Sequence, residues 1–247
     1  VHFDDLGVKR KMLHGEIYHG EQFLAPAYRR RPTAYYCESS GIGQAIRSLP
    51  DGQPLKIGVV GLGAGTLASY GRHGDEMRMY EINEQALDLA RSEFTYLADS
   101  AARIVPVLGD GRLMLEHEPA QGFDLLAIDA FSGDSIPTHL LTVEALQAYL
   151  RHLKSDGILA IHITNRYLDL RPVIAGGARQ IGWTTLLHEL HPDEGDRFCR
   201  HTMWALIVSP KRAFALSKQI KGSEMLAPRP GFAIWTDGFS NLLTILK

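Results

Sequence analysis

Residues 56–65 read KIGVVGLGAG, an apolar run that ends in a glycine-rich turn. Lys56–Gly61 has the continuous apolar character of a buried β-strand, and Ala64–Gly71 after it is typical of a helix. Such a turn lets the backbone approach a ligand closely, and the N-terminus of the next helix offers free N–H groups. We therefore predict a ligand-binding strand–turn–helix unit. Its glycines are Gly61, Gly63 and Gly65.

Strand-like and helix-like segments alternate from this point to residue 208. This alternation predicts an α/β fold, a doubly wound and mostly parallel sheet with helices on both faces. Ligands of such sheets bind beyond the carboxyl ends of the strands, where the strand order reverses. The expected strands are Glu76–Ile82, Ile104–Leu108, Phe123–Asp129, Ile158–Ile163, Trp183–Leu190 and Thr202–Val208. The expected helices are Glu84–Glu93 (capped by Asn83), Arg112–His117, Val143–Leu153 (capped by Thr142) and Leu170–Ile181.

The first 50 residues have a different pattern. Val8–Leu24 alternates polar and apolar residues around two glycines, which predicts an antiparallel hairpin or meander. Ser39–Leu49 is expected to form a helix on the main sheet. We therefore divide the chain into a small β-rich subdomain, residues 1–50, and an α/β domain, residues 51–247. The tail after Pro210 is expected to be less regular.

Composition excludes several classes of protein. Apolar residues make up 45% and charged residues 22% of the 247 residues, which argues against disorder and against a fibrous repeat. The net charge of −2 gives no reason to expect a nucleic-acid partner. Uninterrupted apolar runs stay well below the ~18 residues of a membrane span, so this segment is expected to make no direct membrane contact. The chain begins with Val, which predicts a fragment of a longer protein.

The two cysteines, Cys37 and Cys199, are too few for a disulfide framework and lack zinc-binding spacing. A reducing compartment fits this usage better than a secreted one, so the expected location is the cytoplasm.

Two acidic residues lie at the ends of the second and third strands. Glu81 is in the position where a carboxylate accepts hydrogen bonds from ribose hydroxyls. Asp110, in the run Gly109-Asp110-Gly111, could accept a hydrogen bond from an adenine amino group. Each acid alone is equally a surface residue or a helix cap, and the glycine turn alone could be a tight turn without a ligand. Taken together they favour an adenosyl site.

A third acid opens the loop after the fourth strand, whose sequence DAFSGDSIP runs from Asp129 to Pro137. Asp129 follows five apolar residues and is expected at the rim of a dry sheet. Two interpretations stay open: Asp129 orders its own loop, or it binds and deprotonates an amine nucleophile. Asp134, five residues later, is a candidate to hold the charge of the same substrate.

These motifs resemble a known family. IGVVGLGAG, YEIN, VLGDGR and FDLLAIDAFSGDSIP occur in the order found in spermidine synthase-like proteins, the polyamine aminopropyltransferases. HGEQFL, RRRPTAYY, SSGIG, NRYLDL and WTDGFSNLL are similar to a divergent bacterial branch in which this domain follows a membrane-embedded, transporter-like segment. The resemblance implies a Rossmann-like fold of the S-adenosylmethionine-dependent methyltransferase type, a role in polyamine biosynthesis, a small amine as substrate, and a homodimer.

The resemblance also implies residue roles. The cofactor, decarboxylated S-adenosylmethionine or S-adenosylmethionine itself, would be held without a metal. Asp129 would activate the attacking amine, and Asp134, Tyr36 and Tyr18 are the candidates for contact with substrate. The cofactor-binding candidates are Gly61, Gly63, Gly65, Glu81, Asp110 and Gly111.

Three departures from the family pattern bear on the substrate. The family usually carries an aspartate inside the glycine turn to hold the aminopropyl ammonium, and this chain has Ala64. The gatekeeping loop is longer, so Asp134 is displaced by two positions. The N-terminal Asp-Gly…Gln element is replaced by HGEIY, residues 14–18. The first departure weakens the case for the decarboxylated cofactor in particular.

Other polar residues have simpler interpretations. His188, His191, Asp193, Glu194, Cys199 and His201 lie close in the sequence but lack standard metal-ligand spacing, so a polar loop is expected there. Tyr35 and Tyr36 could line the pocket or pack between subdomains. His162 is expected to be a sheet histidine rather than a catalyst. Asn165, Arg166 and Tyr167 could reach the ligand edge, and Asp237 could close over it.

Three hypotheses follow. The first is an aminopropyltransferase-like enzyme with Asp129 as its base. The second is a methyltransferase that uses intact S-adenosylmethionine. The third is a nucleoside-sensing domain without catalysis that regulates an attached membrane segment. Fold alone does not choose among them, because one fold hosts many reactions.

Overall fold

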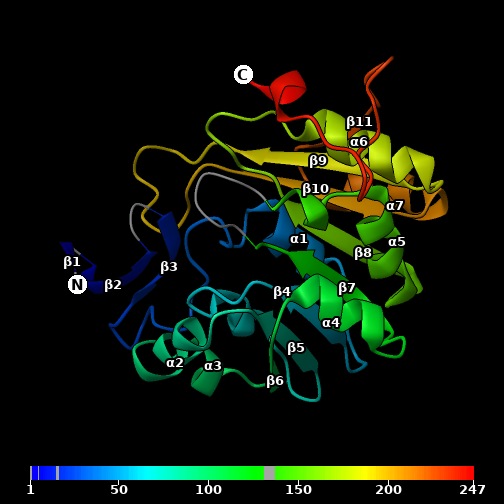
Figure 1. The fold of residues 1–247 in the computed structure, drawn as a ribbon. Helices are drawn as coiled ribbons and strands as arrows, with labels where there is room; N and C mark the ends of the chain where they lie inside the picture. Colours follow the sequence, from blue (N-terminus) through cyan, green and yellow to red (C-terminus); the bar gives the residue numbers. More distant parts are fainter. Residues whose placement is uncertain (1, 5, 15–16, 131–136) are drawn as a thin grey trace.

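One large sheet forms the centre of the protein. A computed structural model describes residues 2–4, 6–14, 17–130 and 137–247. Within them the main sheet has the order β11-β9-β10-β8-β7-β4-β5-β6, parallel from β6 to β8 and antiparallel beyond (Figure 1). The predicted doubly wound, mostly parallel sheet is confirmed. Its strands are β4 (Lys56–Val60), β5 (Glu76–Glu81), β6 (Arg103–Leu108), β7 (Phe123–Ile128), β8 (Leu153–His162), β9 (Thr184–Leu190), β10 (Thr202–Val208) and β11 (Ser223–Leu226).

The strand order reverses between β4 and β7. After β4 the chain adds β5 and β6 on one side, and then crosses to add β7 and β8 on the other side. The backbones that leave β4 and β7 therefore separate at the same edge, where Asp129 N–H donates to the Val60 carbonyl at 2.8 Å. This is the position at which such sheets bind ligands.

Helices cover both faces of the sheet. Side chains alternate between the faces along each strand. In β7, Leu125 and Ala127 join one hydrophobic cluster, whereas Leu126 and Ile128 join the other. The first cluster is closed by α1 (Gly41–Arg47), α2 (Glu84–Ser92), α3 (Tyr96–Asp99) and α7 (Pro210–Gln219). The second is closed by α4 (Gly111–His117), α5 (Val143–Arg151) and α6 (Arg171–Gln180).

Most of the predicted helix boundaries agree with the structure. Asn83 and Thr142 cap α2 and α5 through their side chains, as expected. The helix expected after the glycine turn is instead a 3-10 helix, Thr66–Tyr70. Two further short 3-10 helices are Thr138–Leu140 and Leu242–Ile245.

The expectation of an irregular tail was wrong for residues 210–226, because α7 begins at Pro210 and β11 follows it, whereas residues 227–241 contain no helix or strand. Only two side chains of α7, Ala213 and Leu216, are buried against the sheet, whereas Phe214 on the same helix is 66% exposed. The apolar stripe is therefore too narrow to stand out in the sequence. Every helix in the described ranges is too short or too polar to cross a bilayer.

The N-terminal segment forms a separate antiparallel sheet, as its alternating pattern predicted. Its strands are β1 (His2–Asp4), β2 (Gly7–His14) and β3 (Ile17–Phe23). β3 lies over the glycine turn, because the Ala64 N–H donates to the His19 carbonyl at 3.1 Å. The small sheet thus forms one wall above the edge where the strand order reverses.

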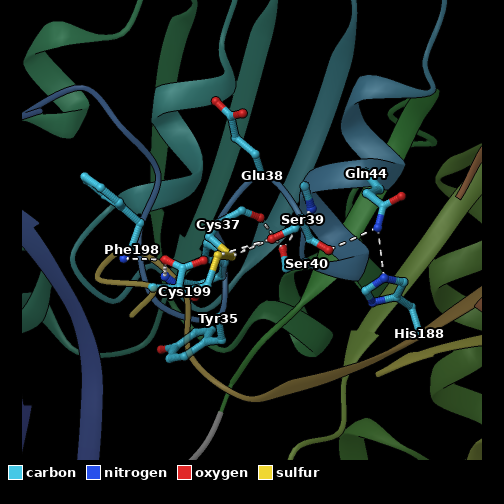
Figure 2. The surroundings of a disulfide bond; sticks show 12 residues. Tyr35, Cys37, Glu38, Ser39, Ser40, Gln44, His188, Phe198 and Cys199 are labelled. Atoms are coloured by element: carbon cyan, nitrogen blue, oxygen red, sulfur yellow. Dashed lines mark hydrogen bonds between the residues drawn. A yellow bond between two sulfur atoms is a disulfide. The ribbon is translucent and has the colours of Figure 1, made fainter. Parts of the chain in front are cut away.

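The two cysteines form a disulfide, which the sequence analysis did not foresee. Cys37 and Cys199 are bonded with their Cα atoms 5.4 Å apart (Figure 2). The bond ties the segment after Tyr36 to the β9–β10 connection, where Ala34 and Cys199 also form an isolated bridge. Because disulfides are rare in reducing compartments, this pairing removes the support that cysteine usage gave to such a compartment.

Candidate functional site

A pocket of about 930 Å³ lies where the strand order reverses. It is bounded by the ends of the parallel strands and by the N-terminal sheet. The predicted site residues that line it are Tyr18, Tyr36, Gly61, Gly63, Glu81, Asp110, Gly111 and Asp129. Gly65 does not line it, and Asp134 lies outside the described residues.

The glycine turn is shaped by close backbone contacts. Gly61 has φ +93°, and a Cβ atom there would lie 2.2 Å from the Asp129 carbonyl oxygen. Gly63 has φ +51°, and its Cβ atom would lie 2.4 Å from the His19 carbonyl oxygen. Any side chain at either position would separate the turn from β7 or from β3. Gly65 is instead packed against Leu97, so its contact is internal to the fold.

Glu81 connects the second strand to the glycine turn. Its carboxylate accepts hydrogen bonds from the Leu62 N–H at 3.0 Å and from the Asn83 N–H at 2.9 Å. Both carboxylate oxygens keep lone pairs for a ligand, since each can accept more than one hydrogen bond. Glu81 therefore orders the turn and presents an acceptor to the pocket at the same time.

Asp110 caps the helix that starts at the third strand end. Its side chain accepts from the Leu113 N–H at 2.9 Å, and the His139 ring lies 3.4 Å from its other oxygen. The neighbouring Gly111 is fixed by packing, because a Cβ atom there would lie 2.5 Å from Val60 Cγ1. Asp110 thus caps the helix and also lines the pocket. In the sequence analysis these two roles were alternatives.

Part of the pocket rim is apolar and open to solvent. Ile82 is 70% exposed, Leu13 is 59% exposed and Leu89 is 47% exposed, and all three line the pocket. Exposed aliphatic side chains that gather beside polar acceptors suit a flat, partly apolar ligand group. This arrangement agrees with the adenosyl site expected at Glu81 and Asp110.

Asp129 also lines the pocket, and two hydrogen bonds hold its carboxylate. The Tyr36 hydroxyl donates to one carboxylate oxygen, and His162 Nδ1 lies 2.7 Å from the other. Only 3% of the Asp129 side chain is exposed. Tyr36 is itself held, because the Tyr70 hydroxyl donates to its carbonyl at 2.6 Å. A carboxylate fixed in this way can receive the cationic or neutral nitrogen of an amine.

His162 is the pocket residue that the sequence analysis set aside as a sheet histidine. Parallel β7 and β8 pair Ile128 with Ile161, so the next positions, Asp129 and His162, lie opposite each other. Two polar residues at the ends of two apolar strands were a signal in the sequence. This signal becomes useful only when the two strands are known to be neighbours and their register is known. The composition of the strands gives neither.

The tyrosines of the pocket are neutral. Burial, reinforced by the nearby Asp129 charge, raises the pKa of Tyr35 and Tyr36 well above the usual value. Burial also raises the pKa of Tyr18, whose ring meets Tyr35 edge-on at 6.0 Å. These hydroxyls therefore carry no charge, and those of Tyr35 and Tyr36 donate hydrogen bonds.

The polar run at residues 188–201 is divided among several contacts. His188 is buried beside Gln44 at 2.9 Å (Figure 2), and Cys199 is in the disulfide. Exposed His191 and His201 both contact Glu189 Oε1, at 3.2 and 2.9 Å, and the hydrogen bond from His201 lowers the pKa of Glu189. These three groups are close enough to hold a metal ion, and their mutual hydrogen bonds account for the arrangement.

Other candidates lie near the pocket edge or away from it. Asn165 and Arg166 line the pocket, and Tyr167 does not. Asp237 does not line it either. Its carboxylate instead pairs with both terminal nitrogens of Arg112, at 2.6 and 2.7 Å, and accepts from Thr142. The C-terminal segment therefore binds the outer side of α4 and α5.

Comparison with curated proteins gives one sequence similarity. The chain is 30% identical over 112 residues to a polyamine aminopropyltransferase from Vibrio vulnificus. The matched part is 43% of this chain and 37% of that protein, so the similarity spans little more than a third of the curated relative. No family model matches the chain.

Comparison with solved structures agrees with the fold. A probable spermidine synthase from Corynebacterium glutamicum superposes with a TM-score of 0.59 at 20% identity, over 82% of this chain and 79% of that chain. A spermidine synthase in complex with the transition-state analogue AdoDATO gives 0.53 at 17% identity, over 91% and 74%. Human methyltransferase-like protein 13 in complex with SAH gives 0.50 at 17%, over 68% and 81%. The resemblance found in the sequence is thus confirmed: this chain is similar to the spermidine synthase-like family.

Proposed function

We propose that this domain transfers an aminopropyl group from decarboxylated S-adenosylmethionine to an amine. The observation that carries the proposal is the position of Asp129, a buried carboxylate that is held by Tyr36 and His162 and lines the same pocket as Glu81 and the glycine turn. We assign the nucleoside end of this pocket to Glu81 and the amine end to Asp129. The similarity to an aminopropyltransferase and to spermidine synthase structures supports the same reaction.

At the nucleoside end, three features suit the adenosyl group. Glu81 offers carboxylate oxygens to the ribose hydroxyls, and Asp110 offers one to the adenine amino group. Ile82 supplies an exposed apolar surface beside them. The sulfonium and the carbon that is attacked would then extend past Gly61 toward Asp129.

At the amine end, Asp129 would bind the acceptor and remove its proton. An ammonium has no lone pair, so it attacks carbon only after deprotonation. The nitrogen–carbon bond then forms as the carbon–sulfur bond breaks, and the sulfonium becomes a neutral thioether. Holding both groups in line supplies much of the rate enhancement in such displacements.

One observation favours a second candidate, a methyltransferase that uses intact S-adenosylmethionine. Ala64 stands where the family usually has an aspartate, and it is fully buried beneath β3. The aminopropyl ammonium would lack that carboxylate partner. The same pocket would serve methyl transfer, and the identity of the donor therefore decides between the two reactions.

The test is calorimetric titration with S-adenosylmethionine, its decarboxylated form and methylthioadenosine, followed by turnover assays with a panel of diamines. We expect the decarboxylated form to bind more tightly than the intact one, and one diamine at least to give product. Asp129→Asn should abolish product with little change in nucleoside affinity. Asp156→Asn, an exposed acid outside the pocket, is the matched control.

Tighter binding of intact S-adenosylmethionine would favour the methyltransferase. Binding of a nucleoside without product from any acceptor would leave a sensing domain as the interpretation. If none of the three ligands bound, the adenosyl site itself would be wrong.

A further inference from the structure

The hydrogen bond between Asp129 and His162 has chemical consequences beyond packing. Both side chains are buried, with 3% and 7% of their surface exposed. Buried polar groups need partners, and a charged carboxylate in a dry site needs donors above all. Asp129 obtains them from Tyr36 and His162, on opposite oxygens. The imidazole of His162 therefore supplies one of the two hydrogen bonds that hold the carboxylate of Asp129, the proposed base.

The imidazole ring is clamped between two aromatic rings. Tyr35 stacks on one face at 4.7 Å and 17°, and Trp204 on the other at 4.8 Å and 25°. The Trp204 indole N–H donates to the Tyr35 carbonyl at 3.1 Å, which fixes the two sides of the clamp to each other. The ring thus keeps Nδ1 directed at Asp129 and Nε2 directed away from it.

Among the described residues, two hydroxyl groups lie beside Nε2. Thr164 Oγ1 lies 2.7 Å away and Thr202 Oγ1 lies 3.3 Å away. A hydroxyl can donate to a bare imidazole nitrogen. Nε2 can therefore accept a hydrogen bond while Nδ1–H donates to the Asp129 carboxylate.

We propose that His162 is a positioning residue that acts through Asp129 in the proposed transfer. The ring orients the carboxylate by one hydrogen bond, on the oxygen that Tyr36 does not contact, and leaves it free to take the proton of the amine. The expected effect of His162 on turnover rests on the proposed function. The contact between His162 and Asp129 rests on the geometry alone.

Two substitutions separate the positioning role from simple packing. His162→Asn keeps a donor near the position of Nδ1, whereas His162→Ala removes both the donor and the ring. We expect His162→Ala to lower kcat about 100-fold or more with nucleoside affinity within a few fold. His162→Asn should recover at least tenfold of that loss.

His188→Asn is the matched control. His188 is a buried sheet histidine, 3% exposed, on β9, and it lies outside the pocket. Its substitution should leave kcat unchanged. A kcat for His162→Ala within threefold of wild type would overturn the proposal, as would equal losses of kcat in His162→Asn and His162→Ala.

A measurement without turnover tests the contact itself. In proton–nitrogen NMR spectra of the imidazoles, His162 should give a slowly exchanging, downfield Nδ1–H resonance that disappears in Asp129→Asn. Its absence from wild type overturns the inference whatever the enzyme does. If the resonance is present and no amine yields product, the proposed function fails while the Asp129–His162 pair stands.

Discussion

The backbone of Gly61 is in contact with the backbone of Asp129: a Cβ atom on the glycine would lie 2.2 Å from the aspartate carbonyl oxygen. The glycine turn and the proposed base are therefore one structural unit, although 68 residues separate them in the chain. The contact is a direct result of the strand order, because β4 and β7 are neighbours at the point where it reverses. Residues that would hold the two substrates are aligned by the same pair of strands.

Gly61→Ala should damage the site more than an ordinary glycine substitution. The new Cβ atom would push β4 and β7 apart, and φ +93° is also unfavourable for alanine. We expect a loss of about 2–4 kcal/mol in the free energy of unfolding, together with loss of nucleoside binding. Chemical denaturation and calorimetry measure the two effects. Gly52→Ala is the control, since Gly52 has φ +83° with nothing within 4 Å of its added atom, and it should cost only about 1 kcal/mol.

Tyr36→Phe should separate catalysis from folding. The ring would keep its packing, while Asp129 would lose one of its two donors. We expect stability to fall by about 1 kcal/mol and kcat by roughly tenfold, with nucleoside affinity nearly unchanged. Steady-state kinetics and calorimetry test this. Tyr149→Phe removes a buried hydroxyl from the other face of the sheet and should leave kcat at the wild-type value; equal losses in both variants would contradict the role of Tyr36.

Removal of the disulfide should lower stability strongly. The bond joins residues 162 positions apart, and cross-links across long loops restrict the unfolded chain most. We expect Cys37→Ser with Cys199→Ser to lose about 2–5 kcal/mol in the free energy of unfolding. Denaturation with and without a thiol reductant measures it. Reductant should destabilise wild type and leave the double variant unchanged, and an equal response of both proteins would argue against the bond.

The contact between Asp237 and Arg112 should make stability depend on acid pH. The hydrogen bond from Arg112 lowers the pKa of Asp237 in the folded protein. Stability from this contact is therefore complete above the unfolded pKa of about 4 and is lost as the pH falls through the folded value. Asp237→Asn should lower the free energy of unfolding by only about 1 kcal/mol near neutral pH, because the Asp237 side chain is half exposed and solvent weakens the contact.

The curves of wild type and Asp237→Asn should begin to approach each other near pH 4 and should converge only below the lowered pKa of Asp237 in the folded protein. Thermal unfolding from pH 7 to pH 3 provides the comparison. Asp156→Asn, an exposed acid, should follow wild type throughout. A constant difference between Asp237→Asn and wild type at all pH values would exclude the ionic contribution.

The core of the fold was predictable because its strands are buried on both faces. β4 and β7 are nearly all apolar, and glycines or acids mark their ends, so the position of the pocket followed from the sequence. α7 and β11 were not predicted because few of their side chains are buried, so neither element has a clear apolar pattern in the sequence. The disulfide was missed because two distant cysteines carry no information about their separation in space.

The candidate site was predictable only in part, and for a physical reason. Glu81, Asp110 and Asp129 lie at or within two residues of the ends of their strands, so their common edge could be inferred. The pairing of Asp129 with His162 depends on register between β7 and β8, which local sequence does not encode. The clamp of Tyr35 and Trp204 around His162 joins three separate regions of the chain and follows only from tertiary packing.

The Cys37–Cys199 bond also makes most of the chain a covalent ring. The ring contains every strand from β4 to β9, and with them the glycine turn, Glu81, Asp110, Asp129 and His162. One backbone cleavage anywhere between the two cysteines would open this ring without dividing the molecule. A protein nicked once in a surface loop, such as the one between β8 and α6, would therefore migrate as a single species until its sulfurs are reduced, with all of those pocket residues still joined to one another.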